Sequence, residues 1–78
     1  MTAIYELREG NPDVIKIGEY SVEPKEAMVD FIQQFLFGNY NTWTYPQIVS
    51  GMRESKIKKD HWYYDDISNK RVLVAYPF

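Results

Sequence analysis

One segment of the sequence has a clear helical period, and this segment constrains the fold more than any other feature. Its apolar side chains recur at spacings of three and four residues: Met28, Phe31, Ile32, Phe35 and Leu36. At 3.6 residues per turn, these positions form one continuous stripe along a helix. Pro24 suits the first turn of that helix, and Gly38-Asn39 favours its end. We therefore expect a long helix over residues 24–37 that packs its stripe against another layer.

Both ends of the chain have the pattern of a β-hairpin. In residues 3–8 two sets of side chains alternate, namely Ala3, Tyr5 and Leu7, and Ile4, Glu6 and Arg8. This alternation gives a strand an apolar side and a polar side. The turn-forming segment EGNPD then leads into a β-branched segment at 14–21. Near the C-terminus, the segments DHWYYDD and KRVLVAYP flank the turn sequence DISN. Since KRVLVAYP is apolar on both faces, we expect it to be an inner strand.

A second, shorter helix is expected from about residue 45 to residue 55. Thr44 and Gln47 have the spacing of a capping box, and Pro46 lies in the first turn. Gly51 would weaken this helix by roughly 1 kcal/mol relative to alanine. The expected element order is therefore ββααββ. We predict a single small α+β domain over residues 1–78, in which an antiparallel sheet of about four strands carries the long helix on one face.

Composition narrows the class of protein further. The chain has 78 residues and no cysteine, which excludes disulfides and thiolate zinc sites and favours a reducing compartment. Its small core must rely on thirteen aromatic residues, comprising two Trp, seven Tyr and four Phe. Charged residues interrupt the N-terminus, and Asp30 interrupts the longest apolar stretch, so we expect neither a signal peptide nor a membrane span. These features predict a cytoplasmic protein.

Reactive side chains are scarce in the sequence. His61 and Asp65 lie four positions apart on a predicted strand, so their side chains would share a face, and Asp65 could orient the imidazole. A second histidine or a cysteine would be needed to complete a transition-metal shell, and neither occurs. The chain also lacks a nucleophile elbow and a glycine-rich phosphate loop. We therefore expect a protein that is not an enzyme and that has no catalytic residues, metal or cofactor.

The leading functional hypothesis is a protein-binding module. Tyr40, Trp43 and Tyr45 lie among Asn and Thr in a predicted loop, where rings with few rotatable bonds favour interface contacts. Trp43 could instead close one end of the core. Residues 1–40 hold seven acidic against three basic residues, and the acidic set would steer a basic partner: Glu6, Glu9, Glu19, Glu23 and Glu26. Such a chain would suit a small inhibitor or adaptor of the phage or mobile-element type, which occludes a surface of a larger protein.

Nucleic-acid binding is the alternative hypothesis. Cationic and aromatic residues gather in the predicted C-terminal hairpin: Lys56, Lys58, Lys59, Trp62, Lys70 and Arg71. Cations neutralise phosphates and rings stack on bases, which is the combination used in single-strand binding. Against this, Asp60, Asp65 and Asp66 would repel phosphates or pair across the hairpin with Lys70 and Arg71. Alternation also places Trp62 and Tyr64 on one face of the strand and Tyr63 on the other. A homodimer formed through a sheet edge or the aromatic loop is a further possibility.

Overall fold

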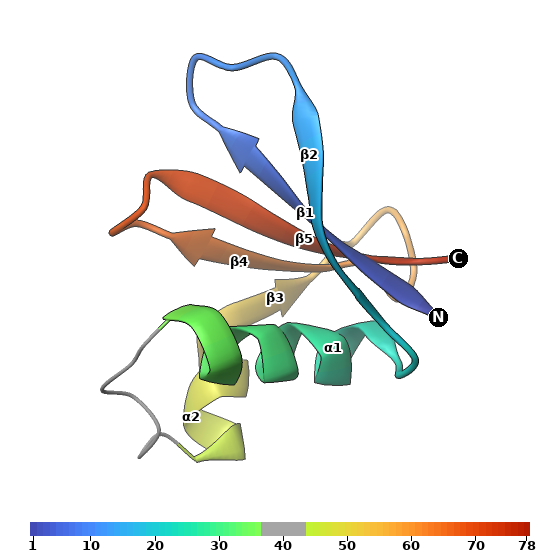
Figure 1. Ribbon diagram of the computed structural model, residues 1–78. Helices are drawn as coiled ribbons and strands as arrows, with labels where there is room; N and C mark the ends of the chain where they lie inside the picture. Colours follow the sequence, from blue (N-terminus) through green and yellow to red (C-terminus); the bar gives the residue numbers. More distant parts are fainter. Residues whose placement is uncertain (37–43) are drawn as a thin grey trace.

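The computed structural model describes residues 1–36 and 44–78 (Figure 1). In chain order its elements are β1 (Thr2–Arg8), β2 (Val14–Tyr20), α1 (Pro24–Phe31), the π-helical turn η1 (Ile32–Leu36), α2 (Tyr45–Ser50), β3 (Met52–Glu54), β4 (Trp62–Asp66) and β5 (Arg71–Pro77). All strands lie in one antiparallel sheet, which confirms the predicted α+β class. Within the described ranges, no helix is both long and apolar enough to cross a bilayer.

Both predicted hairpins form, and they join into one sheet. β1 pairs with β2, and β4 pairs with β5. β1 also pairs with β5 along its whole length, from Thr2 opposite Pro77 to Arg8 opposite Arg71. The strand order is β2-β1-β5-β4-β3. β5 is thus an inner strand, as its two apolar faces predict.

The helices form a second layer on one face of the sheet (Figure 1). Met28, Phe31 and Ile32 of the predicted stripe are buried there. The remaining buried members of the core are Ile4, Ala27, Val29, Ile48, Met52, Leu73 and Ala75. Pro24 is the first residue of α1, as predicted, because this position needs no backbone N–H. The long helix therefore packs on one sheet face as expected.

The predicted continuous stripe fails at Phe35. α1 ends at Phe31 and the chain continues as the π-helical turn η1, while the predicted stop at Gly38-Asn39 lies outside the described residues. The i→i+5 hydrogen bonds of a π-turn widen the helix and displace the following residues from the α-helical stripe. Phe35 is consequently 60% exposed, although its ring centroid lies 4.9 Å from that of Phe31.

The predicted helix over 45–55 is wrong at its C-terminal end, and this adds a fifth strand to the sheet. The helix begins as predicted, because Gln47 Oε1 accepts a hydrogen bond from the Thr44 backbone N–H at 2.8 Å. It ends at Ser50 with Gly51 as its C-cap, and β3 follows at once. β3 pairs with β4, which buries Met52 opposite Tyr64. Sheet pairing and burial of Met52 outweigh one further helical turn, so the order is ββααβββ rather than ββααββ.

The polar side of β1 faces the helix layer, and its apolar side faces away. Glu6 follows Ile4 on the helix side and is only 7% exposed. The Glu6 carboxylate accepts hydrogen bonds from Arg8 Nε at 2.8 Å and Arg71 Nη1 at 2.9 Å. Arg71 Nε also donates to Asp66 Oδ2 at 2.8 Å, which confirms the predicted pairing of Asp66 with Arg71. These ion pairs offset the free-energy cost of burying the charges. Because side chains alternate along a strand, Tyr5 and Leu7 lie on the opposite face.

Candidate binding surface on the open sheet face

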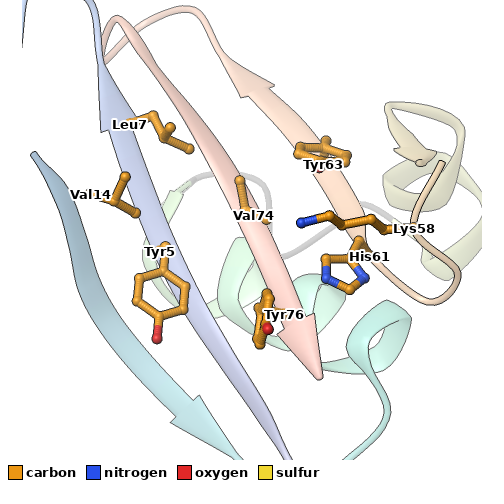
Figure 2. Close-up of a pocket in the computed structure, with 8 residues that line it drawn as sticks. All are labelled: Tyr5, Leu7, Val14, Lys58, His61, Tyr63, Val74 and Tyr76. Atoms are coloured by element: carbon orange, nitrogen blue, oxygen red, sulfur yellow. The ribbon is translucent and has the colours of Figure 1, made fainter. Parts of the chain in front are cut away.

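The sheet face opposite the helices holds a groove of about 390 Å³ (Figure 2). We call this face the open face. The groove is lined by Tyr5, Leu7, Val14, Lys58, His61, Tyr63, Val74 and Tyr76. Figure 2 shows these side chains on the near side of the strands, with the helices behind the sheet. The groove is therefore bounded below by the sheet and is open above.

Strand alternation and register bring these side chains together from distant parts of the sequence. Tyr5 of β1 lies opposite Val74 of β5, and Val74 in turn lies opposite Tyr63 of β4. Directly opposite residues in antiparallel strands point to the same face. Three adjacent strands therefore contribute a transverse row of side chains at the middle of the open face.

The aromatic rings of the groove stand at right angles to one another. The Tyr76 ring lies 6.3 Å from that of Tyr5, with an interplanar angle of 89°. It lies 4.8 Å from the His61 ring, with an angle of 83°. Figure 2 shows the Tyr5 ring face-on and the Tyr76 ring edge-on. Tyr76 thus stands upright between two rings, and the half-buried Tyr5 ring lies on the open side of the sheet.

His61 is held by the backbone rather than by an acidic side chain. Its Nδ1 donates a hydrogen bond to the Lys59 carbonyl at 3.0 Å, because a carbonyl oxygen can only accept. Its Nε2 is enclosed and has no hydrogen-bond partner among the described residues. Asp65, the predicted orienting group, instead forms a bidentate pair with Arg53 at 2.7 and 3.2 Å. Asp65 therefore does not orient the imidazole.

Unpaired positive charge lies at one rim of the groove. Lys58 lines the groove, and Lys56 and Lys59 belong to the same connection between β3 and β4. Within the described part of the chain, none of these three lysines forms an ion pair. Asp65 on β4 is neutralised by Arg53 at 2.7 Å, whereas Glu54 accepts the Asp60 backbone N–H and, like Asp60, forms no ion pair among the described residues. The rim therefore carries three lysines beside two carboxylates, Glu54 and Asp60.

The structure separates the residues of the nucleic-acid hypothesis. Lys58 lines the groove. Tyr63 also lines it, on the face of β4 opposite to that of Trp62. Trp62 packs against the core on the helix side, where Lys25 Nζ lies 5.4 Å from its ring centroid. Arg71 belongs to the buried ion pairs, and Lys70 lies in the turn between β4 and β5. As predicted, Trp62 and Tyr64 share one face and Tyr63 lies on the other.

The predicted protein anchors do not line the groove. Tyr40 and Trp43 lie outside the described residues. Tyr45 begins α2 and is 46% exposed, with Lys25 Nζ 5.9 Å from its ring centroid. Of the predicted steering acids, Glu19 is paired with Lys16, Glu23 is the N-cap of α1, and Glu26 lies exposed in its first turn.

Sequence reasoning missed Tyr5 and Tyr76, which contribute two of the central rings. The signal was present in the alternation of residues 3–8 and in the two apolar faces of β5. An inner strand has a second apolar face either because a second layer covers it or because it binds something. The sequence alone does not distinguish these possibilities, because it does not specify how many layers cover the sheet.

We compared the chain with protein families, with curated proteins and with solved structures, and none of the three comparisons found a match.

Proposed function

We propose that this chain is a non-enzymatic recognition protein whose binding surface is the open face of its sheet. One observation carries the proposal, namely that aromatic and aliphatic side chains from four strands and the β3–β4 connection gather around one open groove. Water contact with such side chains is unfavourable by about 25 cal/mol per Å² of apolar surface. A partner that covers the groove recovers this free energy, and contiguous apolar patches commonly mark binding sites.

The contacts of His61 support binding rather than catalysis. A general base needs an accessible nitrogen and a group that orients the ring. Here the backbone holds Nδ1 and the side chains enclose Nε2, while Asp65 is occupied by Arg53. In addition, the described residues contain no cluster of three or more His, Cys, Asp or Glu side chains suited to a metal ion.

The hypothesis of a larger protein partner held by Tyr40, Trp43 and Tyr45 remains a prediction. Its one described anchor, Tyr45, is exposed on α2 rather than on the open face. Tyr45 and Tyr76 are almost equally exposed, at 46% and 43%. They therefore form a matched pair of ring deletions for testing which surface binds.

Affinity capture from the native host tests the proposed surface. The baits are the wild-type chain, the double variant Tyr5→Ala/Tyr76→Ala and the single variant Tyr45→Ala, each checked by circular dichroism for an unchanged fold. We expect captured protein or nucleic acid to fall at least about tenfold with the double variant, since each lost ring removes contact energy. We expect Tyr45→Ala to capture as much as the wild type. Equal capture by the double variant and the wild type would overturn the proposal.

A further inference from the structure

Resting on the proposed function, we infer that the ligand of the open face is single-stranded nucleic acid. Its bases would stack on the rings around Tyr76, and its phosphates would contact Lys58. The surface differs from the predicted hairpin patch, because Tyr5 and Tyr76 come from β1 and β5, whereas Trp62 and Arg71 lie on the helix side.

The ring arrangement suits unpaired bases. The half-buried Tyr5 ring lies on the open face, and the upright Tyr76 ring separates it from His61 (Figure 2). A base lying on Tyr5 would contact the Tyr5 ring with its face and the upright Tyr76 ring with its edge. Aromatic side chains accept any base in this way because every base has a π-face. In a duplex these faces are already stacked, so the same rings would be left without a partner.

The charges around the groove favour an anionic ligand. Lys58 extends from the β3–β4 connection across the open face toward Val74 (Figure 2). Residues 55–61 hold three lysines and one acidic residue, Asp60. On the neighbouring strands, Asp65 is bound to Arg53 at 2.7 Å, whereas Glu54 accepts the Asp60 backbone N–H and forms no ion pair among the described residues. Three lysines against Glu54 and Asp60 leave a net charge of +1 at this rim, so phosphates meet a modest attraction there.

A protein ligand explains the apolar floor of the groove but not the unpaired lysines. Lysine is depleted in the centre of protein interfaces, because burial of an ammonium group without a partner is costly. A flexible polyanion keeps the lysines partly solvated and still neutralises them. Flat rings beside unpaired lysines are the combination found in grooves that follow a nucleic-acid strand.

Fluorescence anisotropy with labelled oligo(dT) and oligo(rU) of about 20 nucleotides tests this inference. We expect the wild-type chain to bind both at about 50 mM salt and more weakly at about 200 mM. Tyr5→Ala should weaken binding roughly 5-fold to 140-fold, which corresponds to the loss of one stacked base. Tyr5→Phe should retain most of the affinity, because the ring is preserved.

The lysine variants test the electrostatic part. Lys58→Gln should lower the slope of log affinity against log salt by about 0.7, the value for one phosphate contact on a single strand. Lys70→Gln removes the same charge outside the groove and should leave the slope unchanged. Tyr45→Ala, the matched ring control, should leave the affinity unchanged.

Three results would overturn the inference: no binding of either oligonucleotide at about 50 mM salt, tighter binding of a duplex of the same length, or equal loss with Lys70→Gln and Lys58→Gln. A different result is also informative: the wild-type chain binds no oligonucleotide, and the Tyr5→Ala/Tyr76→Ala bait fails to capture a protein that the wild-type bait captures. This result would show that the open face binds protein, so the proposed function would stand and the nucleic-acid inference would fail.

Discussion

Two carboxylates, Glu6 and Asp66, are buried on the helix side of the sheet, and Arg71 bridges them. The hydrogen bond from Arg8, opposed by burial and assisted by the hydrogen bond from Arg71, holds the pKa of Glu6 below its ordinary value of 4.5. A carboxyl group whose pKa is lower in the folded state stabilises the fold while it is ionised. Its contribution is complete above the unfolded-state pKa and is lost as the pH falls through the folded-state pKa.

At the residue scale, Glu6→Gln should therefore destabilise the fold by about 1.5–3 kcal/mol at pH 7, since it removes charged hydrogen bonds in a buried site. The variant should also lose less stability than the wild type as the pH falls below about 4.5. Urea unfolding followed by circular dichroism at several pH values measures both effects. Glu19→Gln, in an exposed pair, is the control and should change stability by less than about 1 kcal/mol. Equal effects of the two variants would contradict a special role for the buried site.

At the element scale, β3 shows how tertiary pairing overrides a local pattern. Residues 45–55 have helix-start signals and an apolar stripe, yet Gly51 ends α2 and the chain turns into an edge strand. The three-residue strand β3 gains pairing with β4 and a bidentate contact between Arg53 and Asp65. The predicted pairing of the hairpin aspartates with Lys70 does not form among the described residues.

A double-mutant cycle tests this pairing of β3 with β4. For Arg53→Ala and Asp65→Ala, we expect a coupling free energy of about 0.2–1 kcal/mol, the range for exposed ion pairs. The same cycle with Lys70→Ala and Asp65→Ala should give a coupling near zero. Thermal or chemical unfolding of the single and double variants provides both values. A larger coupling for Lys70 than for Arg53 would contradict the observed register.

At the scale of the whole molecule, the two faces of the sheet have different surroundings. The helices bury one face, and neither of them covers the other (Figure 1). Adjacent residues of β5 point to opposite faces, with Leu73 fully buried and Val74 lining the groove. The fold thus depends mainly on the face that the helices cover, and the proposed binding surface lies on the other.

Leu73→Ala and Val74→Ala compare the two faces directly. Leu73→Ala should cost about 2–5 kcal/mol of stability, because it creates a cavity in the core. Val74→Ala should cost no more than about 1.5 kcal/mol, because its side chain is only partly buried and leaves no closed cavity. Chemical denaturation of both variants gives the comparison. Similar costs would indicate that a second layer covers the open face.

The amino-acid sequence by itself determined the local elements. Both hairpins, the start of α1, the start of α2 and the inner position of β5 agree with the predictions. They are predictable because period, turn chemistry and helix-start preferences act between residues a few positions apart. The strand β3 was missed because it forms by pairing with β4, and the π-turn at η1 was missed because the apolar period of residues 24–37 is that of a regular α-helix.

Only the tertiary structure decided which side of each strand is buried and which rings meet. Alternation divides β1 into two sides, but the pairing of Glu6 with Arg71, 65 positions away, decides that the polar side can be buried. Tyr5, Tyr63 and Tyr76 come from three strands, and pairing of the chain's two ends aligns them on the open face. Contacts between residues so far apart in sequence arise from the register of the sheet and the position of the helix, which no local pattern encodes.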